Sequence, residues 1–92
     1  EKKVELTYQL VQNYPNPFNP STTISYQLPE KNIVTIKVFD ILGREVAELL
    51  NDTKGAGNYE VTFDASHLSS GIYYYQIKAG NFVQSRKMLL IK

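Results

Sequence analysis

The chain has 92 residues, of which 42% are hydrophobic, 12% aromatic and 21% charged, values typical of one globular domain rather than of a disordered segment. Ten basic and nine acidic residues give a net charge of +1, which argues against nucleic acid or an anionic membrane as the main partner. The chain has no cysteine, which excludes disulfides, thiolate chemistry and the common structural zinc sites. Its longest aliphatic run, residues 88–91, is too short to span a bilayer.

The chain begins at Glu1 without an initiator methionine and carries no signal peptide. We therefore interpret it as part of a longer protein. Residues 1–8 are expected to form the end of an upstream linker and the start of the first strand, and residues 9–92 the domain itself.

Apolar and polar side chains alternate with period two along most of the chain, as in half-buried strands. The first predicted strand covers residues 6–13. It ends at residues 14–20, where three prolines remove backbone donors from any sheet. The second strand covers residues 22–28 and ends at Pro29. Its inward-facing residues are Ile24, Tyr26 and Leu28.

A third strand is predicted over residues 32–40, with Val34, Ile36 and Val38 facing inward. Residues 40–43 form the next turn, in which Gly43 permits a positive φ. Residues 44–51 are the least regular segment. Because Val46, Leu49 and Leu50 also fit one helical face, only the neighbouring β-units favour a strand there.

A polar loop is expected over residues 52–57. Three more strands then follow, over residues 58–64, 71–78 and 82–91. In the sixth strand, Tyr73 and Tyr75 share the inner face and Tyr74 the outer one. Gly80-Asn81 predicts a two-residue hairpin. The unbroken run at residues 88–91 predicts burial on both faces or a bulge. Seven short strands in this length predict an all-β fold, a seven-stranded antiparallel immunoglobulin-like β-sandwich.

The sequence offers little for catalysis or metal binding. Asp64, Ser66 and the only histidine, His67, lie too close together in sequence to form a triad, whose members normally come from different elements. Calcium held by two of Asp40, Asp52 and Asp64 is conceivable, but aspartate is common in turns for its own hydrogen bonds. We expect no enzymatic activity, no metal and no cofactor.

Two binding roles need no catalysis. A carbohydrate-binding accessory module would use exposed tyrosines such as Tyr74, although the chain has no tryptophan for a stacking surface. A structural spacer in a multidomain secreted enzyme would need only the fold. Residues 51–53 match the N-glycosylation sequon, but such three-residue matches arise easily by chance, so we assign this one no function.

Four segments resemble one known family in the same order along the chain. The sequence strongly resembles the C-terminal sorting domain of the type IX (Por) secretion system of Bacteroidetes. The segments are Asn13-Tyr14-Pro15-Asn16-Pro17-Phe18-Asn19-Pro20-Ser21-Thr22-Thr23-Ile24, Val38-Phe39-Asp40-Ile41-Leu42-Gly43-Arg44-Glu45-Val46, Leu68-Ser69-Ser70-Gly71-Ile72-Tyr73 and Lys87-Met88-Leu89-Leu90-Ile91-Lys92.

The resemblance implies that the domain has no catalytic role and serves as a sorting signal carried by a larger parent protein. It implies a seven-stranded sandwich that the type IX translocon recognises in the periplasm. It further implies a sortase-like peptidase as a second partner, cargo domains upstream, and a secreted or cell-surface destination. Nucleic-acid binding and direct membrane insertion are not expected.

Four residues match the family's motifs at positions suited to recognition. Lys87 and Lys92 match its basic closing pattern, and Gly71 and Tyr73 match its Gly-x-Tyr. Gly71 also suits a tight turn and Tyr73 a core position. Removing residues 87–92 is expected to abolish export of the parent protein.

Overall fold

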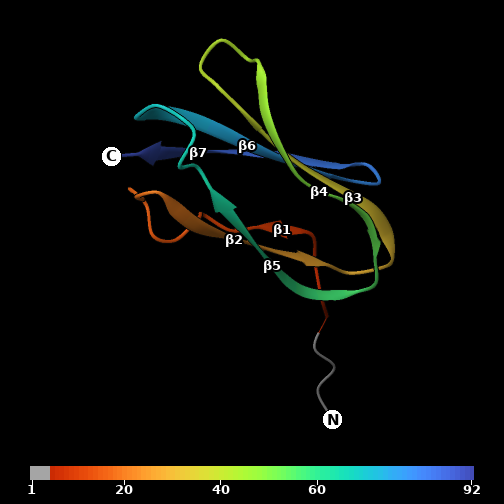
Figure 1. Ribbon diagram of the computed structural model, residues 1–92. Coiled ribbons are helices and arrows are strands. Elements are labelled where there is room, and N and C mark those ends of the chain that lie inside the picture. The colour runs from red at the N-terminus through yellow and green to blue at the C-terminus, as the bar shows by residue number, and fades with distance from the viewer. Residues whose placement is uncertain (1–4) are drawn as a thin grey trace.

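The computed structural model describes residues 5–92, which form seven strands in two sheets that pack face to face (Figure 1). The strands are β1 (Gln9–Leu10), β2 (Ser21–Leu28), β3 (Asn32–Phe39), β4 (Glu45–Lys54), β5 (Gly57–Asp64), β6 (Gly71–Ala79) and β7 (Phe82–Leu90). One sheet has the order β1-β2-β5 and the other β4-β3-β6-β7, and neighbouring strands are antiparallel throughout. The predicted all-β, immunoglobulin-like sandwich is therefore confirmed.

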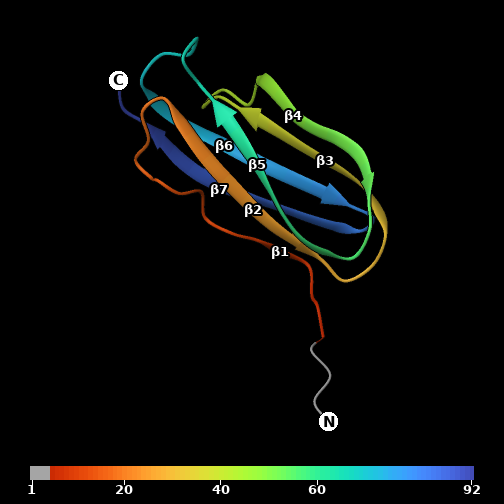
Figure 2. The same cartoon turned by 60° about the horizontal axis from the view of Figure 1, so that its bottom comes forward.

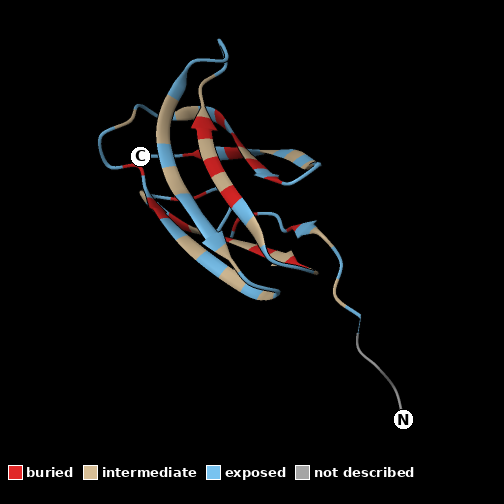
Figure 3. Cartoon of the chain, turned by 90° about the vertical axis from the view of Figure 1, so that its right-hand side faces the viewer, coloured by how far each residue is buried: buried red, intermediate tan, exposed pale blue. Residues whose placement is uncertain are grey.

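The core fills the space between the two sheets, because alternate side chains of each central strand point inward. Figure 3 shows this alternation as buried and less buried bands along the strands. The predicted inward faces of β2 and β3 are confirmed. Tyr73 and Tyr75 are buried as predicted, whereas the Tyr74 side chain is 40% exposed. The largest fully buried side chains are Tyr75, Phe18, Phe63, Leu10, Ile24, Leu28, Ile36, Ile77, Met88, Leu90, Val34 and Val38.

β4 is a strand, although its apolar spacing also fits a helix. Its pairing with β3 shifts register twice, and each shift leaves one extra residue on β4. Leu49 lies between Leu50 and Glu48, which pair with consecutive β3 residues, and Val46 is the extra residue near the strand's start. Such bulges interrupt the period of two. The three- and four-residue spacing of the apolar side chains in β4 therefore comes from bulges.

The predicted bounds of two segments, residues 52–57 and residues 6–13, are wrong. β4 continues to Lys54 and β5 already begins at Gly57, so the polar loop expected at residues 52–57 shrinks to residues 55 and 56. Residues 52–54 form a regular ladder with the start of β3. β1 covers only Gln9–Leu10 instead of residues 6–13, since the backbone N–H of Asn13 bonds across the sandwich to the Tyr75 hydroxyl.

The end of β7 keeps its alternation. Met88 and Leu90 are buried, whereas Leu89 and Ile91 are 36% and 49% exposed. The prediction of two-sided burial or a bulge at residues 88–91 is therefore wrong. The two-residue hairpin at Gly80-Asn81 is confirmed, and Gly80 has the positive φ of 60° that such turns require.

The chain enters the sandwich at the end that carries the β6–β7 hairpin, as Figure 2 shows from below. The Tyr8 ring stacks on the Phe82 ring with 5.0 Å between centroids. The Tyr8 hydroxyl accepts a hydrogen bond from the Asn32 amide at 2.6 Å. This contact fixes where the upstream chain leaves the domain.

The first half of the segment expected to be linker, residues 1–4, lies outside the described residues. Within residues 5–92, no helix is long and apolar enough to cross a membrane.

Candidate recognition surface

The four segments that resemble the sorting-domain family meet at one end of the sandwich. There β3 and β7 end and β6 begins, at the side marked C in Figure 1. Three pairings show the proximity: Phe18 bridges to Leu90, Gly71 pairs with Leu90, and Phe39 pairs with Tyr74. We call this region the terminal end. The β6–β7 hairpin and Tyr8 lie at the opposite end.

Residues 12–18 cross the outer edge of β7, and we call them the strap. The hydrogen bonds between strap and β7 are Phe18 N to Leu89 O (3.0 Å), Ile91 N to Phe18 O (2.9 Å), Leu89 N to Asn16 Oδ1 (3.0 Å) and Gln12 Nε2 to Lys87 O (2.8 Å). An unpaired strand edge is a template for another strand. The strap therefore occupies the edge of β7 that would otherwise be open, and it holds the last strand in place.

A buried tyrosine of the core fixes the start of the strap. The Tyr75 hydroxyl accepts a hydrogen bond from Asn13 N at 2.8 Å and donates one to Val11 O at 2.7 Å. Burial raises the pKa of this hydroxyl above its usual value. The Asn13 amide in turn donates to Thr22 Oγ1 at 3.0 Å and to Pro15 O at 3.2 Å. Buried polar groups need partners, and here they link the strap to both sheets.

Replacing Tyr75 with phenylalanine is expected to lower the free energy of unfolding by about 2–3 kcal/mol, because the buried Asn13 N and the partly buried Val11 O both lose their partner. Urea-induced unfolding monitored by circular dichroism measures the change. Tyr74→Phe is the matched control, since Tyr74 is 40% exposed on the same strand, and it should change stability by less than about 0.5 kcal/mol. Equal stability of the two variants would contradict the assigned role.

The predicted residues Gly71, Tyr73 and Lys92 lie together around the loop of residues 65–70. Gly71 has a φ of 153°, a conformation that residues with a Cβ rarely adopt. The Tyr73 hydroxyl donates to Ser69 O at 2.7 Å. The backbone N–H of Lys92 donates to Ser70 Oγ at 2.9 Å, and its ammonium donates to Ser66 O at 2.5 Å. Gly71 and Tyr73 therefore shape the loop, while Lys92 lies across it.

Lys87 lies apart from that cluster but on the same end of the molecule. It is exposed and pairs with Tyr74, so its side chain shares the outer face of the four-stranded sheet with Tyr74. On this face Ile72 pairs with Leu89 one step further toward the terminal end. The structure thus brings three of the four predicted residues together and places the fourth a short distance along the sheet.

The turn between β3 and β4 forms as predicted, and Asp40 organises it. Its carboxylate accepts hydrogen bonds from Arg44 N at 3.0 Å, Arg44 Nε at 2.8 Å and Leu42 N at 2.9 Å. The hydrogen bond from the Arg44 backbone, followed by the contribution of its side chain, holds the pKa of Asp40 below its usual range. Gly43 completes the turn with a φ of 81°.

The terminal end exposes several large apolar side chains. Their exposed fractions are 70% for Ile41, 73% for Leu42, 40% for Ile72, 36% for Leu89 and 49% for Ile91. Single exposed apolar residues are ordinary, but a group of them marks an interaction site. The sequence analysis missed this group. Two consecutive aliphatic residues inside a predicted turn, at Ile41-Leu42, were the signal that could have revealed it.

The loop that contains His67 has the geometry of a turn and not of a triad. Asp64 Oδ1 accepts a hydrogen bond from Ser66 N at 2.9 Å, and this contact holds the pKa of Asp64 below its usual range. A triad carboxylate would instead orient the imidazole. His67 is exposed.

The aspartates considered for calcium lie on three different elements. Asp40 is paired with Arg44 in its turn, Asp52 lies within β4 opposite Val34, and Asp64 ends β5. Within the part of the chain that the structure describes, no group of three or more His, Cys, Asp or Glu residues is placed to hold a metal ion.

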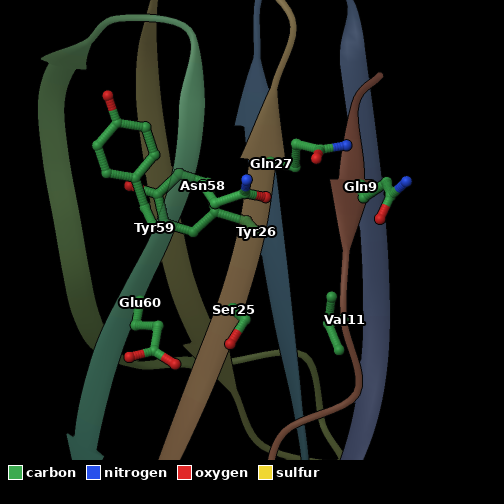
Figure 4. Close-up of a pocket in the computed structure, with 8 residues that line it drawn as sticks. All are labelled: Gln9, Val11, Ser25, Tyr26, Gln27, Asn58, Tyr59 and Glu60. Carbon is green, nitrogen blue, oxygen red and sulfur yellow. The ribbon is translucent and has the colours of Figure 1, made fainter. Parts of the chain in front are cut away.

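A pocket lies on the outer face of the three-stranded sheet (Figure 4), whereas Tyr74, the residue considered for carbohydrate binding, lies on the four-stranded sheet. Gln9, Gln27 and Asn58 form one row across β1, β2 and β5 there. The neighbouring pair, Tyr26 and Tyr59, faces the core instead, where the two rings stack with 5.3 Å between centroids. Burial raises the pKa of Tyr26 to about 12. The row therefore exposes side-chain amides on the outer face of the sheet, whereas the Tyr26 ring belongs to the core.

These features define a small β-sandwich module. Its distinctive surface is the terminal end, which four separate segments of the chain build together. The chain belongs to the family described as "Secretion system C-terminal sorting domain", whose family model matches residues 12–92. It is a type IX secretion sorting domain, and this family is typically non-catalytic. Membership implies interaction with the type IX secretion machinery, attachment to a cargo protein, and export across the outer membrane to the cell surface or the medium. No curated protein and no solved structure is significantly similar to the chain.

Proposed function

We propose that the type IX translocon recognises the terminal end of this domain after the parent protein has reached the periplasm. Lys87 and Lys92 contact the translocon, and Gly71 and Tyr73 give the adjoining loop its shape. A sortase-like peptidase then acts on the exported protein, which becomes attached to the cell surface. The observation that supports this proposal most strongly is the convergence of all four family segments at one end of the fold.

The position of the upstream chain agrees with this arrangement. Tyr8 packs against Phe82 at the opposite end of the sandwich. Cargo that precedes Tyr8 therefore leaves the domain away from the terminal end. The recognition surface stays accessible while a folded cargo is attached.

Export of a reporter tests the proposal. A periplasm-directed fluorescent protein that carries residues 1–92 at its C-terminus is expected to reach the cell surface or medium in a host with a working type IX system. In a translocon-deficient mutant it should remain in the periplasm. Equal retention in both hosts, with the domain shown to be folded, would overturn the proposal and favour a binding module or a spacer.

Charge-removing variants test the two lysines. Lys87→Gln combined with Lys92→Gln is expected to lower export roughly tenfold, because rim charges mainly steer the encounter between partners. Lys78→Gln is the matched control, since Lys78 is exposed on β6 near the opposite end. Export of the double variant at the level of the control would show that the lysines are not recognised.

A further inference from the structure

The two most exposed aliphatic side chains of residues 5–92 are neighbours at the tip of one turn. Ile41 is 70% exposed and Leu42 is 73% exposed. Placing two aliphatic side chains in water forgoes the free energy that burial would provide. Neither belongs to the hydrophobic core, so the fold does not require them to be apolar.

The turn holds this pair in one conformation. Asp40 N donates to Arg44 O at 2.9 Å, and Gly43 N donates to Asp40 O at 3.0 Å. The Asp40 carboxylate accepts three further hydrogen bonds from Leu42 and Arg44. A group that is already ordered loses little conformational entropy when it binds. The turn therefore presents Ile41 and Leu42 as a preorganised apolar projection.

The projection is continuous with the rest of the terminal end. A hollow lies between the turn and the start of β6, and Ser70, Gly71 and Ile72 line its other side. Beyond Ile72, the partly exposed Leu89 continues the apolar surface along β7. Buried aliphatic anchors surrounded by a polar rim are the usual anatomy of a protein–protein interface.

The charged groups around this apolar surface are two ion pairs and two further lysines. Lys87 and Lys92 are exposed and basic, while Arg44 is paired with Asp40 and Glu45 is paired with Lys37 at 3.1 Å. The carboxylate at the turn, Asp40, is already paired with Arg44 at 2.8 Å. A partner that complements this rim carries carboxylates. The near-neutral charge of the whole chain argues against an anionic lipid surface.

We propose that Ile41 and Leu42 insert into an apolar cleft of a type IX machinery protein, and that carboxylates at the rim of this cleft face Lys87 and Lys92. This inference rests on the proposed function and adds to it an apolar anchor and the chemistry of the partner's surface. The lysines steer the encounter, whereas the aliphatic pair holds the complex together.

Export of polar variants tests the anchor. In the fluorescent reporter, Ile41→Ser combined with Leu42→Ser is expected to reduce export at least about tenfold, as the loss of a central apolar anchor does. The matched control is Ile33→Ser combined with Val83→Ser. These two residues are 66% and 54% exposed on the same sheet, toward its opposite end. Thermal unfolding should show that both double variants remain folded.

The two proposals fail in different ways. If the unchanged domain is not exported, the proposed function is wrong. If the unchanged domain is exported and the Ile41/Leu42 variant is exported equally well, the anchor is wrong while the function stands. An equal loss in the Ile33/Val83 control would also overturn the anchor, because the effect would not be specific to the turn.

Cross-linking identifies what occupies the surface. The chain has no cysteine, so Ile41→Cys creates a unique thiol for a photo-cross-linker, and Ile33→Cys provides the control position. An adduct with an identified type IX machinery protein, formed from position 41 and not from position 33, is the expected result. An adduct with a second copy, with cargo or with lipid alone, or no adduct at all, would overturn the proposal.

Discussion

Replacing Phe18 with alanine is expected to lower the free energy of unfolding by about 3–5 kcal/mol. Phe18 belongs to the strap, yet its side chain is only 2% exposed and packs against Phe63 with 6.2 Å between ring centroids. Its backbone also bonds to Leu89 and Ile91 of the last strand. The substitution therefore opens a cavity at the place where the strap joins the two sheets.

Chemical denaturation of the isolated domain measures this loss. Since small domains are stable by only about 5–15 kcal/mol, a loss of this size should move the unfolding midpoint far to lower denaturant. Tyr14→Ala is the control within the same segment, because Tyr14 is 80% exposed, and it should cost less than about 0.5 kcal/mol. A loss below about 1 kcal/mol for Phe18→Ala would show that the strap is not part of the core.

Strands with strict alternation could be predicted from the sequence because their pattern is local. In β2 and β3 every second side chain enters the core, so periodicity alone identifies both the strand and its inner face. Tyr74, between the buried Tyr73 and Tyr75, follows the same rule. The hairpin at Gly80-Asn81 was equally local, since its backbone geometry depends on those two residues.

The features that the sequence did not reveal depend on partners far away along the chain. The bulges of β4 are defined only by its pairing with β3. The strap ends β1 early because Asn13 bonds to Tyr75, 62 residues away. Phe18 lies in the proline-containing segment where the first strand was expected to end, yet its side chain is part of the core. No periodic pattern encodes such long-range contacts.

The candidate site was predictable as a set of motifs but not as a surface. The family motifs pointed to Gly71, Tyr73 and Lys92, and the structure brings these together around one loop. It assigns Tyr73 to the core, where the side chain is only 8% exposed. The position of Ile41 and Leu42 inside a predicted turn was a signal, but the hydrophobicity of a residue alone does not indicate whether a turn buries or exposes it.

Removing residues 88–92 is expected to abolish cooperative folding of the domain. Met88 and Leu90 are fully buried, and the loss of two such side chains costs roughly 4–10 kcal/mol. The deletion also removes the partners of Gly71 and Tyr73 on β6 and of Phe18 in the strap. Deleting residues 87–92 includes all of these losses. Failed export of that deletion would therefore report unfolding before it reports recognition.

A shorter deletion separates the two effects. Removing only Ile91 and Lys92, both exposed, leaves β7 complete, and this variant should keep a cooperative thermal transition in circular dichroism. The longer deletion, residues 88–92, should show none, and a transition near that of the unchanged domain would contradict its expected unfolding.

Because the end of β7 is both part of the core and part of the surface, recognition can be measured only with variants that leave Met88 and Leu90 in place. Lys87→Gln, Lys92→Gln and the Ile41/Leu42 pair meet this condition, since each changes a side chain that faces solvent.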